Sequence, residues 1–157
     1  MKTQSPALFA ILTACSFAGS TAQALDRIVH HFVPDAEGSS QESNLNSLTW
    51  DGTRLYGLSD LGGPLGAQGM AFSLNADGSD FRVIRLFDGS SNPGLRPLGG
   101  VSISGGKLFG AITAGATLQT GGVFSMNPDG SAFQILHSLS TLEGRIPAGP
   151  VAVDGCD

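Results

Sequence analysis

The chain repeats itself after 52 or 53 residues, and this internal repeat limits the folds that it can adopt. Phe-Ser-Leu-Asn-Ala-Asp-Gly-Ser at residues 72–79 returns as Phe-Ser-Met-Asn-Pro-Asp-Gly-Ser at residues 124–131. Leu-Tyr-Gly at residues 55–57 returns as Leu-Phe-Gly at residues 108–110. A repeat of this length is one supersecondary unit, which buries its apolar surface against its neighbours. The chain is therefore expected to be an array of similar units.

Partial copies flank two full units. Residues 28–32 resemble the last part of each unit, and Val-Ala-Val-Asp-Gly at residues 151–155 resembles the first part. The sequence thus predicts a repeat region over residues 25–157, with full units at about 45–92 and 98–142 and partial units at 28–32 and 150–157.

Each unit has the sequence pattern of four short β-strands. In the first unit we expect strands at residues 48–50, 54–58, 70–74 and 81–87. Asp-Gly and Asn-x-Asp-Gly segments between them are typical of hairpin turns. Four antiparallel strands at a period of about 50 residues are typical of a β-propeller blade. The predicted fold class is all-β: β-propeller-like repeats of four-stranded antiparallel blades, with two full blades and parts of another.

Two blades do not complete a propeller. Propellers close with about four to eight blades, and an open array leaves unpaired strand edges. Three explanations stay open. The chain is a fragment of a longer propeller, several copies assemble into a ring, or the two units form a small open sandwich.

The ordered series of motifs resembles the GloVer tandem repeat of exported bacterial "choice-of-anchor" proteins. The series runs Leu-Tyr/Phe-Gly, a Gly-rich loop, Phe-Ser-Leu/Met-Asn-x-Asp-Gly and Ile-Leu-His-Ser-Leu, over about residues 28–155. It departs from the family at residues 55–59, where the family's Leu-Tyr-Gly-Thr-Thr is Leu-Tyr-Gly-Leu-Ser. The resemblance implies an exported, surface-associated, propeller-like protein with many repeats and no assigned activity.

Residues 1–24 have the pattern of a secretory signal peptide. A lysine near the start is followed by an apolar stretch at residues 7–18, which is too short to span a membrane. Ala-Gln-Ala at residues 22–24 is a small-x-small cleavage site. We expect cleavage after Ala24, which would leave Leu25 as the mature N-terminus.

A second processing site is also present in this leader. Leu-Thr-Ala-Cys at residues 12–15 resembles a bacterial lipobox, in which the Cys15 thiol is lipidated before cleavage. Both interpretations place the protein outside the cytoplasm, in the periplasm, at the cell surface or in the medium. The other cysteine, Cys156, would be alone in the mature chain, so no internal disulfide and no cysteine-based zinc site are expected.

Charge and composition argue against some classes of partner. The formal net charge is −5 and charged residues make up 13% of the chain. This balance offers no basic patch for nucleic acid or for anionic lipid. No transmembrane helix is expected in the mature chain.

Three cationic side chains occupy equivalent positions of the repeat: His30, Arg85 and His137. One interpretation is a ring of cationic groups. However, this position lies on the last strand of each unit, which is normally outermost in a blade. We therefore expect the three side chains to lie about a blade apart, too far to share a metal ion.

Two kinds of loop have a chemical and a structural interpretation. The segments at residues 75–80 and 127–132 resemble calcium loops, but the second copy lacks the final acid. A turn explains both copies. The Gly-rich segments at residues 62–66 and 121–122 lack the Gly-Lys-Ser/Thr and the helix start of a phosphate-binding loop, so we expect ordinary loops.

Five acids stay open as members of a catalytic carboxylate pair: Asp51, Asp60, Asp77, Asp88 and Asp129. Their spacing selects no pair, and Asp is common at turns because it hydrogen-bonds the backbone. The only tryptophan, Trp50, could be a sugar-stacking platform. Its repeat equivalents are Ile103 and Val153, which predicts a core position instead.

These features favour an exported, non-catalytic repeat protein that is a binding or structural module of the cell surface, with an unknown ligand. No catalytic, cofactor-binding or metal-binding residue is predicted, and no cofactor is expected. Two alternatives stay open: a truncated fragment without independent function, and a glycan-acting propeller hydrolase or lyase. The expected partner is a surface ligand or protein, or further copies of the chain that close the propeller.

Overall fold

The computed structural model describes residues 10–11, 27–32, 45–61, 69–88, 95–115 and 120–154. Every helix or strand within these residues is a β-strand. The strands are β1 (Ala10–Ile11), β2 (Arg27–Ile28), β3 (Leu45–Trp50), β4 (Leu55–Ser59), β5 (Met70–Leu74), β6 (Arg82–Leu86), β7 (Leu95–Ser104), β8 (Lys107–Ala114), β9 (Gly122–Met126) and β10 (Gln134–Ser138).

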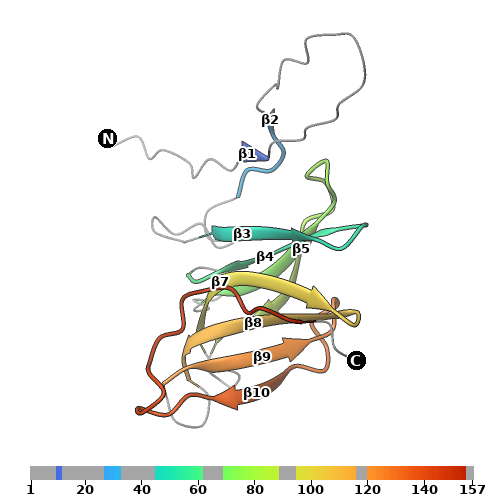
Figure 1. The fold of residues 1–157 in the computed structure, drawn as a ribbon. Helices are drawn as coiled ribbons and strands as arrows, with labels where there is room; N and C mark the ends of the chain where they lie inside the picture. The colour runs from blue at the N-terminus through green and yellow to red at the C-terminus, as the bar shows by residue number, and fades with distance from the viewer. Residues whose placement is uncertain are drawn as a thin grey trace, which may run out of the picture.

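Two four-stranded antiparallel sheets lie next to each other (Figure 1). One has the order β3-β4-β5-β6 and the other β7-β8-β9-β10, so each strand pairs with its neighbour in sequence. We call them blade 1 and blade 2. β7 contacts both β3 and β4, which joins the two sheets along their first strands. The all-β, propeller-like fold of two four-stranded blades is thereby confirmed, and the described residues form no closed ring.

The turn between the third and fourth strands has the same geometry in both blades. In blade 1, the Gly78 N–H donates to the Asn75 carbonyl and the Asn75 N–H to the Ser79 carbonyl, both at 2.9 Å. The Asp77 carboxylate accepts from the Ser79 N–H at 2.9 Å. The same bonds recur in blade 2 among Asn127, Asp129, Gly130 and Ser131. The Asn-x-Asp-Gly segments are therefore hairpin turns, as their sequence predicts.

The fourth strand of each blade carries a β-bulge at the same position of the repeat. In blade 1, the pairing with β5 shifts between Val83 and Arg85, which leaves Ile84 as the extra residue. In blade 2, the pairing with β9 shifts in the same way around Leu136. A bulge bends its strand and takes one residue out of the ladder, so Ile84 and Leu136 are available for contacts outside their own sheet.

The glycine of the Leu-Tyr/Phe-Gly motif makes room for an aromatic ring. A Cβ on Gly110 would lie 2.6 Å from Cζ of Phe124, closer than atoms can pack. A Cβ on Gly57 would overlap the ring of Phe72 in the same way. The second strand therefore needs glycine because the phenylalanine of the third strand lies across it.

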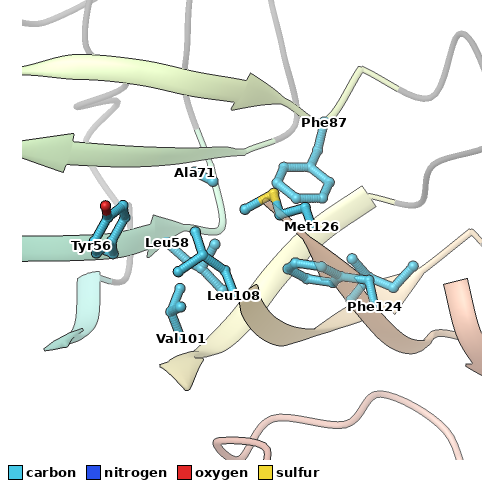
Figure 2. Packing of buried hydrophobic residues seen from close by; sticks show 9 residues of the cluster. Tyr56, Leu58, Ala71, Phe87, Val101, Leu108, Phe124 and Met126 are labelled. Atoms are coloured by element: carbon cyan, nitrogen blue, oxygen red, sulfur yellow. The ribbon is translucent and has the colours of Figure 1, made fainter. Parts of the chain in front are cut away.

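The two blades share one hydrophobic core (Figure 2). Successive side chains of a strand point to opposite faces, so Tyr56 and Leu58 of β4 both face blade 2. They pack with Leu108 and Phe124 of blade 2, and all four are less than 5% exposed. Full burial of a leucine or phenylalanine contributes about 1.5–3 kcal/mol. The contact between the blades is thus part of the core that stabilises each of them.

The two partial units do not form the strands that the sequence predicts. Arg27–Ile28 pairs with β1 in a separate two-stranded sheet, whereas residues 29–32 join no sheet. Residues 151–154 also lie outside any sheet. The red segment that contains them nevertheless runs beside β7 in Figure 1. A strand needs a partner ladder, and the described residues supply no neighbouring strands of these partial units.

The expected core position of Trp50 is wrong, because its side chain is 49% exposed. Its equivalent in blade 2, Ile103, packs against the core that the blades share. Ile103 is covered because blade 1 lies against that face of blade 2. The corresponding face of blade 1 receives Phe32 of the partial unit, which packs on the cluster around Phe72. Burial at this position thus depends on the preceding blade and not on the residue type.

Candidate functional site

The bulged fourth strand of blade 1 lies against the turn of blade 2. Gly130 has a φ of 82°, and a Cβ there would overlap the carbonyl oxygen of Ile84. Glycine is required both for this backbone conformation and for the close approach of the bulge. Beyond the bulge, the ring centroid of Phe87 lies 5.7 Å from that of Phe124 and 6.0 Å from that of Phe133. Backbone and aromatic contacts together fix how one blade docks on the next.

The N-terminal partial unit docks on blade 1 in the same manner. Gly78 has a φ of 87°, and a Cβ there would overlap the carbonyl oxygen of Val29. The ring centroid of Phe32 lies 5.3 Å from that of Phe72 and 5.6 Å from that of Phe81. Each of these residues is the repeat equivalent of one in the contact between the blades. The docking geometry is therefore a property of the repeat and occurs twice.

The cationic position of the repeat contacts a phenylalanine of the next unit. The guanidinium carbon of Arg85 lies 3.9 Å from the ring centroid of Phe133, which is a cation–π contact. Burial lowers the pKa of Arg85, and its Nε has no hydrogen-bond partner among the described residues. The ring of His30 stacks on Phe81 with centroids 4.8 Å apart. The structure thus places these two side chains on separate rings and does not bring them together.

A second set of contacts joins the first strands of neighbouring units. The Thr49 hydroxyl of β3 donates a hydrogen bond to the carbonyl oxygen of Val101 in β7. Ser102, the repeat equivalent of Thr49, donates in the same way to the carbonyl oxygen of Val151. The C-terminal partial unit therefore lies beside blade 2 as β7 lies beside blade 1.

The backbone conformation also shows that the C-terminal partial unit and β7 occupy equivalent places. Arg96 in β7 and Ile146 before the partial unit have left-handed φ values of 55° and 59°. The residues that follow them, Pro97 and Pro147, each lie against the glycine that precedes the third strand of the preceding blade. Residues 146–153 thus repeat the path of the first half of β7 without its ladder.

On the fourth strand of blade 2, the repeat equivalents of the residues that dock blade 1 on blade 2 are exposed. Leu136 is 49% exposed, whereas its equivalent Ile84 packs against the shared core. The His137 side chain is 56% exposed, and its Nε2 lies 2.9 Å from Oε1 of Glu143. Hydrogen bonds from Ser140 and His137 lower the pKa of Glu143 to about 2. Bulge and cationic position are therefore both accessible along β10.

Three of the five candidate acids hydrogen-bond the backbone of their own turns. Asp77 and Asp129 each accept from the N–H two residues further on, at 2.9 Å. Asp51 accepts from the N–H of Thr53 at 2.6 Å and from that of Arg54 at 2.7 Å. These bonds are the ordinary use of aspartate in hairpin turns.

The other two acids have basic neighbours. Asp60 is 1% exposed, and its Oδ2 lies 3.7 Å from Nη2 of Arg96, which links the end of β4 to the start of β7. The charge of Asp88 raises the pKa of Arg85, against the larger effect of burial. Within the described ranges, no group of three or more His, Cys, Asp or Glu side chains is placed to hold a metal ion.

Some predicted features lie outside the described residues: Ala24, Cys15, Cys156 and the Gly-rich segment at residues 62–66. The second Gly-rich segment leads into β9, and the Gly121 carbonyl accepts from the Leu139 N–H at 3.0 Å. In the part of the chain that the structure describes, no helix is long and apolar enough to cross a membrane.

Comparison with known proteins identifies no relative: no family model, no curated protein and no solved structure matches the chain. The resemblance to the GloVer repeat therefore stays a prediction. The repeated contact between units is the feature from which a function can be argued.

Proposed function

We propose that the chain is an exported, non-catalytic repeat protein whose blades form a structural or binding module at the cell surface. The observation that carries this proposal is the docking geometry, in which the close backbone approach to a turn glycine and the contact of a basic side chain with a phenylalanine recur from unit to unit. Polar side chains that could act in catalysis instead make equivalent structural contacts in successive repeat units. Arg85 and His30 lie on rings, and Asp77 and Asp129 hold turns.

The export part of the proposal is supported by the leader pattern of residues 1–24 and by the resemblance to an exported repeat family. Production of the full chain in a bacterium, followed by mass spectrometry of each cell fraction, tests it. We expect a mature product outside the cytoplasm that begins at Leu25. A lipid-modified N-terminal Cys15 would support export as a lipoprotein, and an uncleaved cytoplasmic product would overturn export.

A pair of substitutions in the leader sharpens this test. Ala24→Phe places a bulky side chain where the peptidase needs a small one, so the cleaved product is expected to disappear. Gln23→Phe introduces the same side chain at the tolerant middle position and is expected to leave cleavage intact. Equal loss in both variants would contradict cleavage after Ala24.

The non-catalytic part is tested with the purified chain on starch, pectin and peptidoglycan. We expect no new reducing ends above the buffer control. Release of reducing ends that co-purifies with the chain and falls in an Asp60→Asn variant would overturn this part and support a glycan-acting enzyme.

A further inference from the structure

We propose that copies of this chain associate head to tail, with β10 of one copy docked on blade 1 of the next as β6 docks on blade 2. This inference goes beyond the proposed function and does not depend on export. The two halves of the contact lie at opposite ends of one chain, which makes the interface heterologous. Such an interface closes into a ring or extends into a filament.

The donor half is the fourth strand of blade 2. Leu136 is a bulge residue like Ile84, and it is 49% exposed. His137 occupies the cationic position that Arg85 holds, and Leu139 occupies the position of Phe87. In blade 1 the same three positions carry the contact with the next blade. The residues of β10 therefore fit a blade of the same repeat.

The acceptor half is the turn and aromatic face of blade 1. Gly78, Phe72 and Phe81 are the repeat equivalents of the residues in blade 2 that receive β6. In the single chain, residues 29–32 fill this face, with His30 stacked on Phe81. These residues join no sheet, and their described contacts with blade 1 include the stacking of His30 on Phe81 and the close approach of Val29 to Gly78. His137 of a second copy offers the same ring to Phe81.

The C-terminal partial unit fills the matching place on the other side of the interface. Residues 146–153 lie beside blade 2 without a ladder, where β3 of the next copy would lie. β3 is continuous with a four-stranded sheet, as β7 is where it meets blade 1. Association therefore replaces the contacts of two segments that join no sheet with the contacts of a complete blade. Because association also costs translational and rotational freedom, it is expected to depend on concentration.

Trp50 reports on this interface. Its equivalent Ile103 packs against the core that Tyr56 and Leu58 of the preceding blade help to form. In the assembly, Phe109 and Ala111 of the neighbouring copy would take those places over Trp50. Its side chain, 49% exposed in the single chain, is then expected to become buried.

Light scattering on a sizing column tests the proposal with the purified chain, kept reduced so that Cys156 forms no intermolecular disulfide. We expect a mass of several chains that falls on dilution. As the mass rises, Trp50 emission is expected to shift to shorter wavelength and iodide quenching to decrease. A single-chain mass at every concentration would overturn the proposal, and so would association without a change at Trp50.

Two variants distinguish association through this interface from non-specific association. Leu136→Asp places a charge in the docking contact and is expected to weaken association by about tenfold or more. Leu142→Asp makes the same change at a side chain that is 97% exposed, and it is expected to leave association unchanged. Circular dichroism checks that both variants keep their strands. Equal loss of association in both variants would overturn the proposal.

Discussion

Arg85 tests the contact between the blades at the scale of a single residue. Arg85→Gln removes a cation 3.9 Å from the centroid of Phe133 and is expected to lower the free energy of unfolding by about 1 kcal/mol. Arg82→Gln, on the same strand, changes a side chain that is 65% exposed and is expected to cost less than about 0.5 kcal/mol. Urea unfolding measures both.

A double-mutant cycle isolates the ring contact. In a Phe133→Leu background, Arg85→Gln is expected to cost nothing further, because the ring that attracts the cation is gone. An unchanged cost in that background would mean that Arg85 acts through another neighbour, such as Asp88.

The equivalence of His30, Arg85 and His137 is visible in the sequence, but their partners are not. Each of the first two contacts a phenylalanine of the following unit, so the partner depends on how units stack. Comparison of the repeat units therefore identifies this position but does not predict its contact with a phenylalanine of the next unit. The sequence does carry a usable signal, because an aromatic residue directly precedes the fourth strand of each blade, at Phe81 and Phe133.

Gly130 tests the turn as a docking element. Its φ of 82° costs alanine about 1–2 kcal/mol, and a Cβ would also overlap the Ile84 carbonyl. Gly106 has a φ of 71° with open space where its Cβ would lie, so Gly106→Ala measures the backbone effect alone. We expect Gly130→Ala to cost about 3 kcal/mol or more and Gly106→Ala about 1 kcal/mol. Equal losses in urea unfolding would show that the bulge makes no energetic contact with the turn.

Strands and turns are the elements that the sequence predicts well, because their signals are local. Alternation and turn chemistry predict the third strand at residues 70–74, which is where β5 lies. The bulge at Ile84 has no local sequence signal, and because the same bulge occurs around Leu136, where the described residues include no further blade, it belongs to the repeat and not to the docking. The strands expected at residues 28–32 and 151–153 do not form in a blade, since resemblance to a strand supplies no partner ladder.

At the scale of the whole molecule, the repeat predicts that units stack but not what covers the outer faces. Trp50 shows the difference, because the same position is covered in blade 2 and exposed in blade 1. The residue type is a poor predictor of burial where burial depends on the neighbouring blade. Such positions at the two ends of an array are where sequence and structure are expected to disagree.

The shared core predicts that both blades unfold together. Leu58 belongs to blade 1 but packs in a cluster with Leu108 and Phe124 of blade 2, and it is 2% exposed. Leu58→Ala is expected to cost about 2–5 kcal/mol, whereas Leu142→Ala, at a side chain 97% exposed, is expected to cost almost nothing. Because residues of both blades build this cluster, separating the blades would expose it, so we expect the loss to be cooperative, although blade 1 also has a second cluster around Phe72. Trp50 fluorescence, which reports on blade 1, and far-ultraviolet circular dichroism, which reports on both blades, are expected to give one coincident transition. Strand signal that survives the Trp50 transition would show that blade 2 is stable alone.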